Sequence, residues 1–187
     1  WDSNAEKSID PIYGKDFEGY LIYRATDPSF NTVKTITDTY GNPIFWEPIA
    51  QFDLKNGLSG PHPIPIGETG AHFNMGNDTG LQYYFIDENV ENGRTYYYAV
   101  CSYDKGYDTD FFSRGLTKKD QLSIIAPSEC EKNIHTNLVG EVVEMGRNCA
   151  TVVPNAPSAE YVQGEIGNVE HSGLATGTVN VSVLNPF

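Results

Sequence analysis

The stretch RTYYYAVCSY, residues 94–103, is the strongest strand pattern in the chain and decides its fold class. It is rich in Tyr and Val and follows the turn pair Asn92-Gly93. A second stretch, FEGYLIYRA at 17–25, alternates in the same way, so that Tyr20 and Ile22 share one face of a strand. Both stretches predict β-strands, and no long helix-forming run accompanies them.

Shorter patterns extend this all-β prediction along the chain. Further strands are predicted at 45–52, 71–75, 81–87 and 120–126, within a long irregular stretch at 32–80 and on either side of the strongest strand. After Pro127 the pattern predicts a hairpin with 138–144 as one arm, a linker-like break at 154–157, and an alternating strand at 176–184.

Composition excludes two classes of partner. The chain has 187 residues and a net charge of −13, so a nucleic-acid partner is not expected, because phosphate binding needs a positive surface. No apolar run approaches the roughly 20 residues that a membrane-spanning helix needs.

The three cysteines allow at most one internal disulfide. Cys130 and Cys149 flank the hairpin-like stretch and are the preferred pair, which leaves Cys101, inside the strongest strand, as a free thiol. Two alternatives stay open: three unpaired cysteines, or a zinc site made by Cys130, His135 and Cys149.

Several of these residues resemble a fibronectin type III domain. Trp1 corresponds to the core Trp of the second strand in such domains, and residues 19–23 correspond to the third strand. The turn before the sixth strand is matched by Val90, Gly93, Thr95 and Tyr96. The resemblance implies a Greek-key β-sandwich over about 1–127, with Tyr96 as a tyrosine corner whose hydroxyl bonds to the backbone upstream. It also implies that Tyr96, Tyr98, Val100 and Ser102 face inward.

Two departures from the family define the domain organisation. The first strand of the sandwich is missing, and residues 32–80 form an insertion longer than the family norm. Residues 128–187 are then expected to be a β-rich linker and the start or part of a second β domain. A sandwich without its first strand has an open edge, which another part of the same protein or a neighbouring subunit would complete, in the latter case building a filament.

The phrases DFEGYLIYRA, PIAQFDLKNGLSG and NGRTYYYAVCSYDKG are similar to modules of very large secreted bacterial surface proteins. This similarity implies an extracellular or cell-surface location and a structural or adhesive role without catalysis. The sequence agrees with that expectation, because it contains neither a G-x-S-x-G nor an H-E-x-x-H motif and its four His are widely separated.

Acidic loops suggest a calcium site. In the expected sandwich, the loop before the third strand and the loop after the sixth strand emerge at the same end. The candidate ligands on these loops are Asp2, Asp16, Asp104, Asp108 and Asp110. Converging carboxylates suit Ca²⁺, which takes about six to eight oxygen ligands. The alternative is that these loops are solvated acidic surface.

Carbohydrate binding is the rival function. Aromatic faces stack on sugar rings, and a β-sandwich can display them. The candidates are Phe45, Trp46, Tyr83, Tyr97, Tyr107, Phe111 and Phe112. The alternative is that most of these side chains cover the core.

Overall fold

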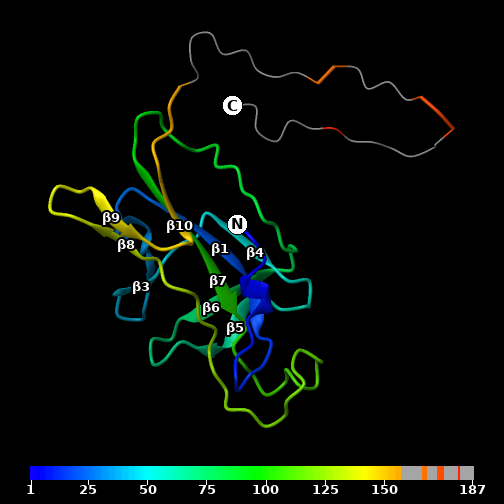
Figure 1. Ribbon diagram of the computed structural model, residues 1–187. Helices are drawn as coiled ribbons and strands as arrows, with labels where there is room; N and C mark the ends of the chain where they lie inside the picture. Colours follow the sequence, from blue (N-terminus) through cyan, green and yellow to red (C-terminus); the bar gives the residue numbers. More distant parts are fainter. Residues whose placement is uncertain (157–165, 168–171, 175–180, 182–187) are drawn as a thin grey trace.

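The protein is built on one antiparallel sheet of four strands (Figure 1). The computed structural model describes residues 1–156, 166–167, 172–174 and 181. The strand order is β10-β7-β1-β4. The bounds are Phe17–Ala25 for β1, Ala50–Asp53 for β4, Tyr96–Asp104 for β7 and Cys149–Val152 for β10.

Three two-stranded hairpins and two short 3₁₀ turns complete the described part of the chain. The hairpins are β2 (Ile36–Thr37) with β3 (Pro43–Phe45), β5 (Ser59–Pro65) with β6 (His72–Asn77), and β8 (Ile134–Thr136) with β9 (Val142–Met145). The 3₁₀ turns are η1 (Ala5–Lys7) and η2 (Asn31–Val33). The chain is therefore all-β, as its composition predicts.

The pairing of β1 with β7 is the longest ladder in the sheet. It runs in register from Phe17 opposite Asp104 to Ala25 opposite Tyr97, with one irregularity beside Glu18. Gly19 makes the approach of β4 possible, because a Cβ atom there would lie 2.4 Å from the carbonyl oxygen of Phe52. Any larger residue at position 19 would force the strands apart.

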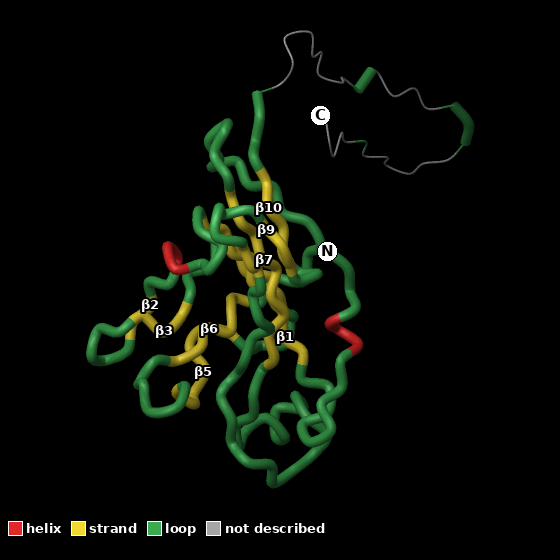
Figure 2. The backbone as a smooth tube through the Cα atoms, turned by 60° about the vertical axis from the view of Figure 1, so that its left-hand side comes forward, coloured by secondary structure: helices red, strands yellow, loops and turns green. Residues whose placement is uncertain are grey.

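Both faces of the sheet are covered. Figure 2 shows β2–β3 and β5–β6 on one side of the sheet and the N-terminal segment on the other. On the first side, Leu21 and Tyr23 join a buried cluster with Phe73 and Met75 of β6. On the second side, the ring of Tyr20 lies 5.9 Å from that of Trp1. This double covering explains why eight of the nine residues of β1 are buried.

The inward face of β7 differs from the expected one. Tyr96 is buried, but Tyr98, Val100 and Ser102 are only half-buried, whereas the alternate residues Tyr97, Ala99, Cys101 and Tyr103 belong to the core. The cause is the loop after β7, whose Tyr107 and Phe111 pack into that core together with β6. Sequence periodicity identified the two faces but not the better covered one.

The two strongest strand predictions are confirmed. The strand predicted at 17–25 has those bounds as β1, and the one predicted at 94–103 is β7, from Tyr96 to Asp104. The hairpin predicted after Pro127 exists as β8–β9, although residues 138–140 lie in its turn. The shorter predictions at 45–52 and 71–75 correspond to pieces of β3, β4 and β6.

Two strand predictions are wrong. Residues 81–87 form no strand: they run beside the sheet without a ladder, and Asp87 instead binds Arg24 through its carboxylate. Residues 120–126 also form no strand, since only Ile125 pairs with the chain, in an isolated bridge to Tyr107. The strand predicted at 176–184 lies outside the described residues except for residue 181.

Tyr96 makes the hydrogen bond expected of a tyrosine corner. Its hydroxyl oxygen accepts the backbone N–H of Glu91, five residues upstream, at 2.9 Å. The side chain of Tyr96 is 4% exposed, so the bond is sheltered from water. It holds the turn before β7 against the strand.

We expect Tyr96→Phe to lower the free energy of unfolding by about 1 kcal/mol, because the Glu91 N–H loses its partner in a sheltered place. Tyr97→Phe is the matched control in the same strand, since the Tyr97 hydroxyl makes no hydrogen bond within the described part of the chain. Urea denaturation of both variants measures the difference. Equal losses in the two variants would show that the Tyr96 hydroxyl has no special role.

Candidate functional site

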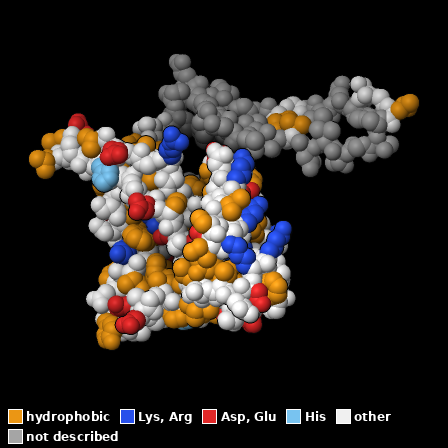
Figure 3. Space-filling model, turned by 60° about the horizontal axis from the view of Figure 1, so that its bottom comes forward, with side chains coloured by type: hydrophobic (Ala, Val, Ile, Leu, Met, Phe, Trp, Pro, Cys, Tyr) orange, Lys and Arg blue, Asp and Glu red, His pale blue; other side chains and the backbone are white. Residues whose placement is uncertain are grey.

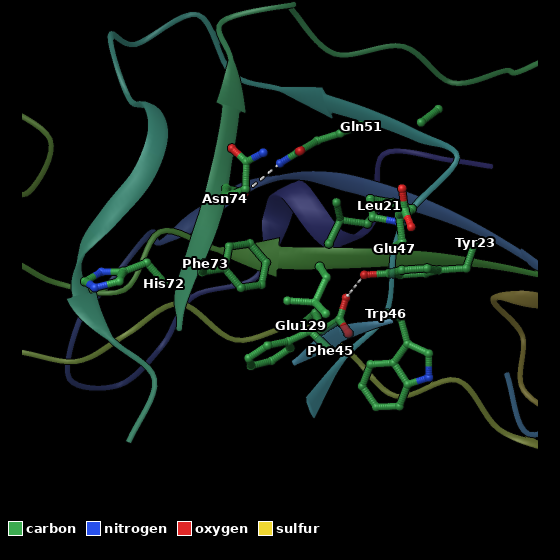
Figure 4. Close-up of a pocket in the computed structure, with 13 residues that line it drawn as sticks. Leu21, Tyr23, Phe45, Trp46, Glu47, Gln51, His72, Phe73, Asn74 and Glu129 are labelled. Carbon is green, nitrogen blue, oxygen red and sulfur yellow. Dashed lines mark hydrogen bonds between the residues drawn. The ribbon is translucent and has the colours of Figure 1, made fainter. Parts of the chain in front are cut away.

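A cavity of about 370 Å³ opens beside β1, β4 and β6, and we call it the aromatic pocket (Figure 4). Its apolar walls are Leu21, Tyr23, Phe45, Trp46 and Phe73. Its polar lining is Glu47, Gln51, His72, Asn74 and Glu129. Size and lining are those of a small-molecule site, where apolar walls carry a few polar groups.

Strand geometry places these side chains. Leu21 and Tyr23 are two residues apart in β1 and therefore point to the same face, and Phe73 reaches them from β6. Phe45 and Trp46 stand at the end of β3. Glu129 comes from a distant segment that bridges to Tyr103 of β7.

An ion pair is buried at one end of the pocket. Glu129 accepts hydrogen bonds from the Tyr23 hydroxyl at 2.6 Å and from Lys132 Nζ at 2.5 Å. The ammonium of Lys132 also lies 4.3 Å from the ring centroid of Tyr23 and 4.0 Å from that of Trp46. Burial and then the Glu129 charge raise the pKa of Tyr23, so this phenol remains a hydrogen-bond donor.

The opposite end of the pocket is held by an amide. Gln51 Nε2 donates to the carbonyl oxygen of Asn74 and to the Tyr103 hydroxyl, both at 2.9 Å. These bonds tie β4 to β6 and β7, and the bond from Gln51 to Asn74 is drawn in Figure 4. The pocket is therefore pre-formed by bonds between elements far apart in the sequence.

The predicted calcium ligands do not all meet. Asp16 and Asp104 line a second cavity, of about 530 Å³, together with Asp10; we call it the acidic cleft. Asp2 instead accepts bonds from Asn4, and Asp108 accepts the N–H of Thr109. Neither of them, nor Asp110, lines the acidic cleft.

A cation lies close to the carboxylates of the acidic cleft. Lys105 is 8% exposed, and its Nζ donates to the carbonyl oxygen of Lys15 at 2.9 Å. Burial lowers its pKa, while Glu18, Asp16 and Asp104 act in the opposite direction. Burial and then the charge of Asp104 raise the pKa of Asp16. Within the described residues, no group of three or more His, Cys, Asp or Glu side chains is arranged to hold a metal ion.

Acidic side chains are also dispersed over the surface seen in Figure 3. On this face, Asp and Glu stand at several separate places, while hydrophobic side chains gather in the lower centre. The view shows no concentrated acidic patch that would attract a cation to this side of the molecule.

Glu18 and Asp53, two carboxylates that the sequence analysis did not single out, are fully buried. Glu18 accepts both its hydrogen bonds from Asn56 Nδ2, at 2.9 and 2.8 Å. Asp53 accepts the N–H groups of Asp78 and Thr79, at 2.5 and 3.0 Å, and the Thr79 hydroxyl. Burial raises the pKa of Glu18 to about 8, although Asn56 and Lys105 act to lower it.

The raised pKa of Glu18 predicts a pH-dependent stability. A pKa above the unfolded value means that the protonated form favours the folded state, so this contribution is complete below about pH 4.5 and is lost as pH rises towards 8. We expect the melting temperature to fall by about 5 °C or more over that interval. In Glu18→Gln the fall should be much smaller.

Glu88→Gln is the control for this prediction, because Glu88 is an exposed carboxylate outside the buried pair. Calorimetry at several pH values between 5 and 8.5 measures all three proteins. A wild-type profile that Glu18→Gln leaves unchanged would contradict the assignment of the pH dependence to Glu18.

The three cysteines meet around one asparagine and carry free thiols. Asn148 Nδ2 lies 3.5 Å from Cys130 Sγ and 3.9 Å from Cys101 Sγ, and Cys149 Sγ lies 3.7 Å from Asn148 Oδ1. The structure does not join the expected pair, Cys130 and Cys149, and Asn148 contacts both sulfurs. His135 of the alternative zinc site lies in β8.

Comparison of the chain with protein-family models, with curated proteins and with solved structures finds no match. Among the residues that the structure describes, no helix has the length and apolar character to cross a membrane.

Sequence reasoning named Phe45 and Trp46 but missed the polar half of the aromatic pocket. The separation of Glu129 and Lys132 by three residues was the one local signal of their ion pair. Nothing local indicates that this pair packs against Tyr23, more than 100 residues away. Three of the other aromatic candidates, Tyr97, Tyr107 and Phe111, are core residues.

Proposed function

We propose that this chain is a non-catalytic structural module of an extracellular or cell-surface protein. The observation that carries the proposal is the use made of the aspartates: ten of the twelve accept a backbone N–H through their carboxylates. They are Asp2, Asp10, Asp27, Asp38, Asp53, Asp78, Asp87, Asp104, Asp108 and Asp120.

Asp27 illustrates what these contacts do. Its carboxylate accepts the N–H groups of Ser29, Asn31 and Thr32 at 3.1, 3.0 and 2.9 Å, and the Thr32 hydroxyl at 2.7 Å. These bonds satisfy backbone donors in a loop that has no ladder of its own. The acidity of the chain thus supports loop shape, which favours a scaffold over a catalytic role.

The sheet supports a fibronectin type III-like architecture. In that sandwich the third strand lies beside the sixth and the sixth beside the seventh. The order β1, β7, β10 reproduces this arrangement, and the hydrogen bond of Tyr96 adds the tyrosine corner. The opposing sheet of the sandwich, and partners such as further domains of the same protein or neighbouring subunits, belong to the proposal.

Calcium is proposed as a weak ligand of this module at the acidic cleft. The support is that Asp16 and Asp104 line the same cleft and that, after burial, the charge of Asp104 raises the pKa of Asp16, a repulsion that a bound cation would relieve. Because the Lys105 charge lies nearby, and no three carboxylates of the described residues are grouped to hold a metal ion, we expect a low affinity, in the millimolar range.

Thermal melts test both parts of this proposal. Asp27→Ala should lose about 1–3 kcal/mol of stability, because several loop N–H groups lose their acceptor. Asp110→Ala is the control, since the Asp110 carboxylate accepts no hydrogen bond within the described part of the chain. Millimolar Ca²⁺ should raise the wild-type midpoint by about 2 °C relative to EDTA, and Asp16→Asn should abolish that rise.

Equal melting points for Asp27→Ala and Asp110→Ala would remove the observation on which the structural role rests. An identical wild-type midpoint in Ca²⁺ and EDTA would remove calcium and leave the scaffold role without a cation.

The aromatic pocket favours a second candidate function, carbohydrate binding. Its half-buried Phe45 and its polar lining residues Gln51 and Asn74 are the combination that sugars need, a ring to stack on and amides to bond. Trp46 is a poorer platform than the sequence suggested, because the ammonium groups of Lys34 and Lys132 lie 4.9 and 4.0 Å from its ring centroid.

Titration of the isotope-labelled chain with a panel of soluble mono- and oligosaccharides tests this candidate by NMR. We expect shifts at Phe45 and Phe73 for at least one sugar, and an affinity about tenfold weaker in Phe45→Ala. Tyr40→Ala is the control, because Tyr40 is 88% exposed and lies outside the pocket. A panel that shifts no resonance of the pocket would eliminate this candidate.

A further inference from the structure

The three thiols meet at a junction on one edge of β7. Cys149 begins β10, which pairs with β7 opposite Ala99, whereas Cys130 belongs to a segment that pairs with β7 further along. Its N–H donates to the carbonyl oxygen of Ser102 at 2.9 Å. Cys101 lies in β7 between these two attachments, so all three sulfurs are gathered around Asn148.

Side-chain contacts favour one particular pair. The bond from the Cys130 N–H places Cys130 opposite Ser102, the residue that follows Cys101 in β7, so Cys101 is its diagonal neighbour. A hydrogen bond also joins the thiols of Cys101 and Cys130. Both sulfurs also lie near the same atom, Asn148 Nδ2, whereas Cys149 Sγ lies near Asn148 Oδ1.

The two thiols of this pair differ in exposure and acidity. Cys130 is exposed, while Cys101 has no exposed surface. A hydrogen bond from the Cys101 thiol, and then one from Ser102, lower the pKa of Cys130 to about 6, although burial and the Glu129 charge oppose this. The Cys101 thiol donates that bond, and this bond and burial raise the pKa of Cys101. The charge of Lys132 opposes the rise only in part.

An accessible thiolate beside a buried thiol is the arrangement of oxidation-sensitive cysteine pairs. Cys130 is exposed and its pKa is lowered, so it is the sulfur that an oxidant meets first. Cys101 is then the partner whose thiol is hydrogen-bonded to it, while burial raises the pKa of Cys149 as well.

We propose that Cys130 is a site of oxidation by hydroperoxides and that Cys101 resolves the product into a Cys101–Cys130 disulfide. This inference stands independently of the proposed structural role.

Two steps account for all atoms and electrons. In the first, the Cys130 thiolate attacks one oxygen of the hydroperoxide and the O–O bond breaks. The other oxygen takes up a proton and leaves as water or alcohol, so that Cys130 becomes a sulfenic acid. In the second, the Cys101 sulfur attacks the Cys130 sulfur and the S–O bond breaks. The hydroxyl leaves as water with the proton of Cys101. Two thiols lose two electrons in total, and the peroxide gains them.

Peptide mapping of the full chain identifies the bond. The reduced protein is treated with one equivalent of hydrogen peroxide at pH 7, blocked, and digested with trypsin without reduction. Cleavage after Arg94, Lys105, Lys119, Lys132 and Arg147 places the three cysteines in separate peptides, 95–105, 120–132 and 148–187. We expect peptide 95–105 linked to peptide 120–132.

Variants establish the order of events. Cys149→Ser should form the same linked peptide as the wild type. Cys101→Ser should accumulate a sulfenic acid at Cys130 that a dimedone probe labels, and Cys130→Ser should give no linked peptide. Because substitution of the buried Cys101 can unfold the chain, the wild-type map remains the deciding measurement.

A second measurement uses no variant. The alkylation rate of Cys130 by iodoacetamide, followed by mass spectrometry, should rise to half its maximum near pH 6. A map in which Cys130 is linked to Cys149, or in which peroxide leaves all three thiols reduced, would overturn the proposal. So would an alkylation midpoint for Cys130 at the ordinary thiol value of about 8.5.

Discussion

The ladder between β1 and β7 is the constraint on which the rest of the structure depends. It pairs strands about 80 residues apart and places an apolar row on each face, so each face must be covered by chain from elsewhere. The N-terminal segment covers one side, and β6 with the loop after β7 covers the other. The aromatic pocket lies against Leu21 and Tyr23 in the middle of β1, and the acidic cleft lies at the end of the ladder, against Phe17 and Asp104.

Charge is organised around that ladder rather than spread uniformly over the surface. Two lysines, Lys105 and Lys132, are largely buried next to carboxylates. The buried Glu18 shares its surroundings with Lys105, which connects the protonation of the core to the acidic cleft. In a chain with a net charge of −13, these two lysines thus lie where burial makes a charged carboxylate unfavourable in free energy.

The sequence predicted the strands that have strong local patterns. It failed for segments whose structure depends on whether another strand pairs with them. β1 and β7 carry dense alternating aromatic and aliphatic residues, so their bounds were found almost unchanged. Residues 81–87 have a similar pattern but no neighbouring ladder, and they form no strand. The short β10 was missed because Cys149–Val152 has little pattern of its own and becomes a strand only by pairing with Tyr96 to Ala99.

Site residues divide in the same way. Asp16 and Asp104 were expected to converge because they stand at paired strand ends, and they do share a cavity. Asp2 and Asp108 instead accept hydrogen bonds within their own loops, and Asp110 lies outside the cleft, none of which composition reveals. The meeting of three thiols at Asn148 required the register of two segments on β7, which only the folded chain supplies.

The sharing of one edge of β7 by two segments has a consequence for how this chain can vary. The chain leaves β7 at Asp104, returns at 128–130, departs again through the β8–β9 hairpin, and returns as β10. Each of these two connections is a loop that begins and ends at β7. Closing a longer loop costs little extra entropy, so related sequences could lengthen, shorten or replace either loop without altering the ladder between β1 and β7. Variation in length between Lys105 and Pro127, or between Glu131 and Asn148, would then change the surface beside β7 and leave the ladder unchanged.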